Sequence, residues 1–110
     1  MQVKEHQHEN FMTLRPEGEL DANSSIVMDD VIRENIDKGH YHLHVDCSGL
    51  QYISSAGLGV FISYMDELRE NDGKFVFSNM SDNVRQVFRL LGLEAITTIV
   101  GNESEAEVQF

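Results

Sequence analysis

The sequence predicts an α/β domain with a mixed, mostly parallel sheet of 4–5 strands and 3–4 helices. Apolar residues recur with helical spacing in three segments, and short runs rich in β-branched and aromatic residues stand between those segments. At the start of the chain, two short strand-like runs stand on either side of Glu9 and Asn10, an arrangement typical of an antiparallel hairpin. After the hairpin, each predicted helix links two predicted strands, as right-handed crossovers in a largely parallel sheet require.

Composition limits the number of domains and excludes several classes of partner. A chain of 110 residues suffices for one core, so we expect residues 1–110 to form a single domain. The 8 Lys and Arg residues against 19 Asp and Glu give a net charge of -11, which argues against nucleic acid and anionic membranes and favours protein partners with basic surfaces. The N-terminus is too polar for a signal peptide and no apolar run reaches membrane-spanning length, so we expect a cytoplasmic protein.

The first three elements are predicted to be two strands and a helix. The strands cover residues 3–8 and 11–16, and Pro16 is expected to end the second one because proline cannot donate to a strand ladder. Residues 21–25 are dense in side chains that cap helices, and Gly39 lies where a C-terminal cap is expected. One face of this helix collects the apolar residues Val27, Met28, Val31, Ile32 and Ile36.

The next strand carries a row of histidines. Between Tyr41 and Cys47, apolar residues alternate with His42, His44 and Asp46, which predicts a strand whose polar face need not be buried. Side chains two apart on a strand share a face, so His42 and His44 could hold a transition metal together with a third ligand. We favour no metal site, because no Cys or Glu motif completes one, and a pH-sensitive patch is the alternative. The histidines of undetermined role are His6, His8, His40, His42 and His44.

Two further helices follow. From Leu58 the apolar spacing is helical, and a turn at Asp72 and Gly73 closes that helix. Ser81 or Asp82 can cap a third helix that Gly92 ends. Two short strands are predicted at residues 74–78 and 96–100. The acidic C-terminal segment, residues 102–110, forms either a helix or a frayed tail.

A strand-like run leads into Ser54 and Ser55, and a helical pattern marked by glycines follows. Hydroxyls at a helix start can cap the free backbone N–H groups, and a phosphate there is stabilised by the same amides and the helix dipole. The stretch lacks the spacing of glycine-rich nucleotide loops and of the hydrolase elbow, so nucleotide binding and hydrolysis are disfavoured. From these residues alone, capping by both serines is the favoured interpretation.

Three carboxylates and the single cysteine are the other candidate groups near the serine turn. The carboxylates Glu19, Asp21 and Asp46 lie at predicted strand or loop ends, so we expect them to gather beside the two serines at one edge of the sheet. Cys47 is the only cysteine, so no internal disulfide is possible. No catalytic triad pattern accompanies Cys47, and we expect it to pack as a small apolar residue.

Three stretches together resemble the STAS domain family, and specifically the stand-alone anti-sigma factor antagonists of bacteria. They are GELD at 18–21, DCSGLQYISSAGLG at 46–59 and VFRLLGL at 87–93. The resemblance implies phosphorylation of Ser55 by an anti-sigma factor that is also an ATP-dependent serine kinase of the GHKL type. It further implies that the unphosphorylated form binds this kinase and frees a sigma factor, and that a PPM-type phosphatase restores it.

The resemblance also assigns roles to the neighbours of Ser55 and implies neither a cofactor nor catalysis by this chain. Asp21 matches an acidic position that helps the kinase recognise its substrate, and Gly57 and Leu58 match the motif that starts the helix. The expected partner-binding residues are therefore Asp21, Ser54, Ser55, Ala56, Gly57 and Leu58.

The chain departs from the family pattern at two positions. Ser54 stands where the family commonly has an aspartate, and Ala56 replaces a common serine or threonine. Ser54 therefore remains the second candidate for the phosphate acceptor. A STAS scaffold or small-ligand module without phosphorylation is the alternative function, and an enzyme or metal-binding domain that uses the histidines is a third.

Overall fold

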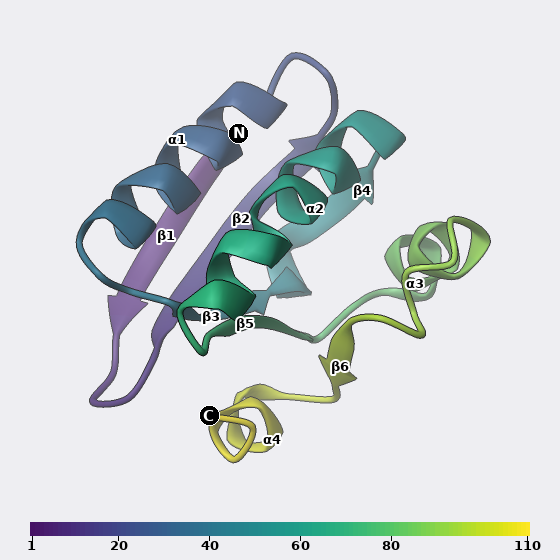
Figure 1. Ribbon diagram of the computed structural model, residues 1–110. Coiled ribbons are helices and arrows are strands. Elements are labelled where there is room, and N and C mark those ends of the chain that lie inside the picture. The colour runs from purple at the N-terminus through teal and green to yellow at the C-terminus, as the bar shows by residue number, and fades with distance from the viewer.

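The structure is a computed structural model that describes residues 1–110, and it consists of one mixed sheet with helices on both faces (Figure 1). The six strands are ordered β1-β2-β3-β5-β6, with β4 paired to β2, and only the β1–β2 pair is antiparallel. The elements are β1 (Gln2–Gln7), β2 (Met12–Leu20), α1 (Ser25–Asp37), β3 (His42–Asp46), the short 3-10 helix η1 (Cys47–Gly49), β4 (Leu50–Ile53), α2 (Ser55–Glu70), β5 (Lys74–Ser78), α3 (Asp82–Leu90), β6 (Thr98–Val100) and α4 (Glu103–Glu107). The predicted fold class is confirmed, with one more strand than expected.

The additional strand is β4, which sequence analysis treats as strand-like but does not count. It has only four residues, and η1 separates it from β3. A four-residue strand shows too few alternations for a reliable periodicity, and its pairing with β2 depends on contacts distant in sequence. The C-terminal segment forms the short helix α4, and the last strand begins at Thr98, two residues later than predicted.

Strand β2 changes partner half-way along its length. Its first residues, Met12–Leu14, pair with β3, and its last residues, Gly18–Leu20, pair with β4. The prediction that Pro16 ends this strand is wrong, because Pro16 lies between the two parallel ladders and removes a hydrogen bond from neither. Gly18 adopts a φ of +105° next to the register shift, a conformation that favours glycine.

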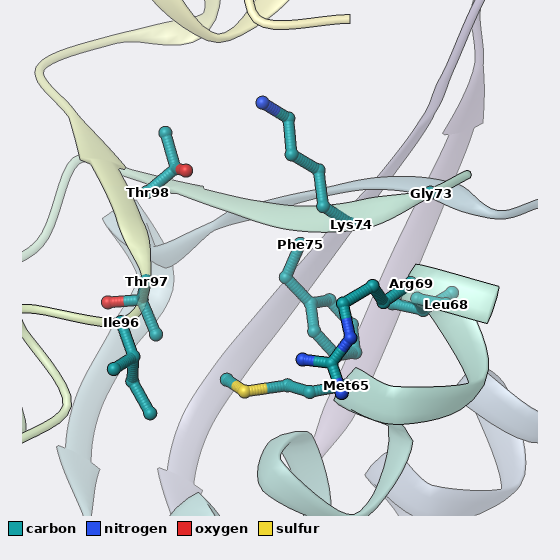
Figure 2. Close-up of a pocket in the computed structure, with 9 residues that line it drawn as sticks. All are labelled: Met65, Leu68, Arg69, Gly73, Lys74, Phe75, Ile96, Thr97 and Thr98. Atoms are coloured by element: carbon teal, nitrogen blue, oxygen red, sulfur yellow. The ribbon is translucent and has the colours of Figure 1, made fainter. Parts of the chain in front are cut away.

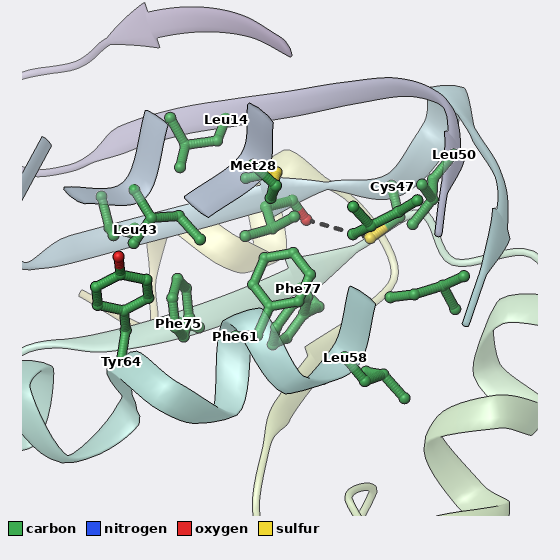
Figure 3. Packing of buried hydrophobic residues seen from close by; sticks show 14 of the residues in the cluster. Leu14, Met28, Leu43, Cys47, Leu50, Leu58, Phe61, Tyr64, Phe75 and Phe77 are labelled. Carbon is green, nitrogen blue, oxygen red and sulfur yellow. Dashed lines mark hydrogen bonds between the residues drawn. The ribbon is translucent and has the colours of Figure 1, made fainter. Parts of the chain in front are cut away.

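The core lies between the sheet and helices α1 and α2, with α3 closing one end (Figures 1 and 3). Phe61 of α2 packs edge-on against two rings of β5, with centroids 5.4 Å from Phe75 and 5.2 Å from Phe77. Phe77 in turn lies 5.1 Å from Phe88 of α3. These aromatic contacts fix α2 against the sheet and so fix the position of its N-terminus.

The polar face of β3 is partly covered, in contrast to the open face that the sequence suggested. His44 is fully buried, with Nδ1 2.9 Å from the Thr13 hydroxyl and Nε2 2.6 Å from the Ser78 hydroxyl. Helix α4 covers this face, and its Glu103 accepts a hydrogen bond from Thr13 and lies 3.1 Å from His8 Nε2. Burial lowers the pKa of His44 below its ordinary value. None of the helices combines the length and the apolar character needed to cross a membrane.

Candidate functional site at the start of helix α2

The start of α2 is held beside the end of β2. Ile53, the last residue of β4, is aligned with Leu20, the last residue of β2. The Ser54 backbone N–H donates to the Leu20 carbonyl at 2.9 Å, which extends the strand pairing by one residue. The turn that carries Ser54 and Ser55 therefore lies directly beside the turn that carries Asp21.

Ser54 is the N-cap of α2. Its backbone is extended (φ -94°, ψ 171°), and its hydroxyl accepts a hydrogen bond from the Gly57 N–H at 3.2 Å. Its carbonyl accepts the first helical hydrogen bond, from Leu58 N–H at 3.0 Å. A serine in this position stabilises a helix by about 1 kcal/mol relative to alanine. The capping role predicted for this turn is thus performed by Ser54.

Ser55 differs from Ser54 in its surroundings. It is the first residue of α2, its side chain is exposed, and its hydroxyl makes no hydrogen bond within residues 1–110. The first backbone N–H groups of a helix lack intrahelical partners, and the positive end of the dipole lies there. The interpretation that both serines act as caps is therefore wrong for Ser55, whose hydroxyl is free.

Ala56, Gly57 and Leu58 divide between surface and interior. Ala56 is exposed, whereas Gly57 and Leu58 are buried. A Cβ at Gly57 would lie 2.7 Å from both Cγ and the carbonyl oxygen of Leu20, so only glycine lets α2 approach β2 this closely. Gly57 and Leu58 hold the helix start in place, while Ser55 and Ala56 face outward.

Asp21 forms a charged, hydrogen-bonded turn beside the serines. Its Oδ1 accepts hydrogen bonds from the backbone N–H groups of Asn23 at 2.9 Å and Ser24 at 3.0 Å. The hydrogen bond from the Ser24 backbone holds the pKa of Asp21 below its ordinary value, so the carboxylate stays ionised. Ser24 in turn donates its hydroxyl to the Glu19 carbonyl at 2.7 Å, which ties the turn to the end of β2.

Asp46 lies elsewhere, and the prediction that it gathers with Asp21 beside the serines is wrong. Val45 is aligned with Leu14 on β2, whereas Ile53 is aligned with Leu20, six residues further along. At about 3.3 Å per residue, that separates Asp46 from the serine turn by roughly 20 Å. The prediction failed because η1 and the uncounted strand β4 intervene between β3 and α2. The Asp46 carboxylate instead caps η1 by accepting from the Ser48 N–H.

Helix α2 and the elements β4 and α1 carry exposed apolar residues that sequence analysis did not single out. Ser55, Gly59 and Ile62 follow one another at helical spacing along the exposed side of α2. Tyr52 of β4 is 49% exposed and Ile26 at the start of α1 is 65% exposed. The signal in the sequence was Tyr52 itself, a large aromatic residue two positions before the serine turn. Exposed aromatic and aliphatic residues are typical of protein-binding surfaces.

Cys47 and the histidines do not contribute to this site. Cys47 is buried in the core, as predicted, and burial raises the pKa of its thiol. Both ring nitrogens of His44 are occupied by hydroxyl partners, which removes it as a ligand beside His42. Residues 1–110 contain no group of three His, Cys, Asp or Glu side chains placed to hold a metal ion.

Comparisons with known proteins identify the family of this chain. A model of the STAS domain matches residues 2–106. The chain belongs to the STAS domain family. Among curated STAS relatives, the anti-sigma-B factor antagonist of Staphylococcus epidermidis is 26% identical over 87 residues, which cover 79% of this chain and 81% of the relative.

Solved STAS structures share the fold. The anti-sigma factor antagonist SpoIIAA in its unphosphorylated form superposes with a TM-score of 0.83 and 24% identity, over 98% of this chain and 95% of that chain. The Bacillus cell fate determinant SpoIIAA in its phosphorylated form superposes with a TM-score of 0.74 and 24% identity, over 98% of both chains. Structures named SpoIIAA therefore share this fold in an unphosphorylated and in a phosphorylated form.

Proposed function

We propose that this STAS domain is an anti-sigma factor antagonist of a cytoplasmic partner-switching system. In its unphosphorylated form it binds an anti-sigma factor that is also a GHKL-type serine kinase, and the sigma factor is released. Phosphorylation of Ser55 ends this binding, and a PPM-type phosphatase restores the unphosphorylated form. The chain acts as a binder and a substrate, with no catalysis of its own.

The free, exposed hydroxyl of Ser55 at the first position of α2 is the observation that supports this proposal best. A kinase needs an accessible hydroxyl, and Ser54 is half-buried and already accepts a hydrogen bond from Gly57. A phosphate on Ser55 would lie near the unpaired N–H groups and the positive end of the helix dipole. Phosphorylation is therefore compatible with the folded domain, so the switch acts at the surface rather than by unfolding.

The substitution of Ser54 for the family aspartate is compatible with this function. Serine and aspartate are about equally good N-caps, so the helix start retains its cap. What the substitution removes is a negative charge next to the acceptor. Asp21 supplies an ionised carboxylate in the adjoining turn. The two turns are adjacent because the Ser54 N–H donates to the carbonyl of Leu20, the residue before Asp21.

Bulk and the cost of desolvating added charge at the partner interface explain how a phosphate would block binding. It would add roughly -1.5 to -2 charges in the turn next to the one that carries Asp21. A partner that binds this surface closely would have to desolvate those charges, which is costly without compensating cations. The change stays local because the aromatic packing beneath α2 is untouched.

A charge substitution at Ser55 tests the proposal. We expect Ser55→Glu to weaken binding to the cognate kinase by at least about tenfold, which corresponds to roughly 1.4 kcal/mol. Ser104→Glu is the matched control, because it adds the same charge on the exposed surface of α4. Equal affinity of Ser55→Glu and wild type for the kinase, measured by calorimetry, would contradict the switch and favour the scaffold function.

A further inference from the structure

A groove at the C-terminal end of α2 has no role in the proposed switch. It lies between the last turns of α2, the start of β5 and residues 96–98, and has a volume of about 340 Å³ (Figure 2). Small-molecule sites typically have volumes of about 300 to 1,000 Å³. Met65 and Arg69 lie 10 and 14 positions after Ser55, or roughly 15 to 21 Å along the helix axis. The groove is therefore separate from the serine turn.

Four of the nine residues that line the groove are apolar, namely Met65, Leu68, Phe75 and Ile96. Leu68 and Phe75 form its floor and are 0% and 5% exposed. Met65 extends from α2 toward Ile96, which stands on the opposite side (Figure 2). Ile96 is 66% exposed, so a large apolar side chain faces water at this position. An alkyl chain in the groove would remove this surface from water.

The charge of the lining is unusual for this chain. Two cations, Arg69 and Lys74, line the groove and no carboxylate does, although the chain has 19 Asp and Glu residues against 8 Lys and Arg. Arg69 pairs only with Asp66 on its own helix, and both side chains are more than three-quarters exposed. Such surface pairs are weak, so the guanidinium is free to exchange partners. Lys74 has no ion pair within residues 1–110.

We propose that this groove binds a free fatty acid, with its alkyl chain along Phe75, Met65 and Ile96. The carboxylate is held by Arg69, which lines the groove together with Met65 and Phe75. The Lys74 side chain points away from Arg69 and takes no part (Figure 2). A long apolar body with one anionic end matches apolar side chains with one cation, Arg69, beside them. Ligands with several charges do not match it, because Arg69 is the one charged partner and four of the lining side chains are apolar.

Titration of the isotope-labelled full chain with decanoate, followed by NMR, tests this proposal. We expect saturable shifts confined to residues 65–75 and 96–98. Decylammonium has the same chain with the opposite charge, and acetate has the same head group without the chain; neither should bind saturably. Arg69→Gln should weaken decanoate binding about tenfold, since a hydrogen bond to a charged group is lost. Arg85→Gln, which removes an arginine outside the groove, should leave the affinity unchanged.

Three results would overturn the assignment. They are an absence of saturable shifts with decanoate, equal binding of decylammonium, and an affinity that does not change in Arg69→Gln. Equal binding of decylammonium would indicate an unselective apolar surface, such as one that contacts a protein partner. The titration needs no kinase, so its failure would leave the proposed role of Ser55 unaffected.

Discussion

At the residue scale, two adjacent and chemically identical serines have different surroundings. The Ser54 hydroxyl accepts from Gly57 N–H, while the Ser55 hydroxyl is free and exposed. The sequence could identify the pair and the helix start, because capping residues and glycines leave a local signal. It could not assign the cap, since that depends on which residue has extended backbone angles. The structure separates a structural serine from an accessible one.

Alanine substitutions at the two serines should separate these roles. We expect Ser54→Ala to lower the free energy of unfolding by about 1 kcal/mol, because the cap on Gly57 is lost. Ser55→Ala should change it by less than about 0.5 kcal/mol, as is usual for a surface position without partners. Urea denaturation followed by circular dichroism measures both values. Equal losses in the two variants would show that the capping assignment is wrong.

Two glycines of α2 give a matched pair of predictions. Gly57→Ala should destabilise the domain by about 1–3 kcal/mol, because its Cβ would lie 2.7 Å from the Leu20 carbonyl oxygen, which is backbone and cannot easily move. Gly59→Ala should stabilise it by up to about 1 kcal/mol, since no atom lies within 4 Å of the added Cβ and alanine favours helices. Thermal unfolding of both variants checks that one substitution lowers the stability of the domain and the other raises it. A neutral Gly57→Ala would contradict the close approach of α2 to β2.

At the element scale, local patterns predicted the hairpin and the helices, and non-local contacts caused the errors. Pro16 was expected to end β2, yet the strand continues because its parallel partner changes from β3 to β4. Asp46 was misplaced because β4 was not counted. The burial of His44 depends on α4, more than fifty residues later in the chain, whose few residues gave only a weak helical signal. Periodicity reports neighbours along the chain, whereas these features depend on neighbours across the sheet.

Burial of His44 beneath α4 makes stability dependent on pH. Burial lowers the pKa of His44 in the folded state. As the pH falls below about 6.5, the unfolded state therefore binds more protons than the folded state does. The free energy of unfolding should therefore decrease between about pH 7 and pH 5, above the range in which carboxylates such as Asp46 titrate. The charged or titratable groups near His44 are Asp46, Glu103 and His8, and these modulate the effect.

Substitution of His44 isolates this contribution. His44→Gln should have a flatter profile of unfolding free energy against pH over this range than wild type. His6→Gln, at an exposed position on β1, should retain the wild-type slope. Urea denaturation at a series of pH values gives the comparison, and parallel profiles for wild type and His44→Gln would contradict the role of the buried imidazole.

At the scale of the whole molecule, helix α2 connects two separate surfaces of an acidic domain. Its N-terminus presents Ser55 beside the ionised Asp21, and its C-terminal turns form one wall of the groove with Arg69. The aromatic packing beneath α2 holds both ends against one rigid sheet. The net charge of -11 favours a partner with a basic surface. At the serine turn, a phosphate would oppose binding by its bulk and by the cost of removing its charge from water. This arrangement supports a switch that changes surface charge and leaves the fold intact.

Phosphate mapping after incubation with the cognate anti-sigma factor kinase and ATP tests the central claim most directly. Wild type, Ser54→Ala and Ser55→Ala are compared by mass spectrometry of their peptides. We expect phosphate on Ser55 in wild type and in Ser54→Ala, and none in Ser55→Ala. Phosphate on Ser54, or no phosphate on a chain that the kinase binds, would contradict Ser55 as the switch.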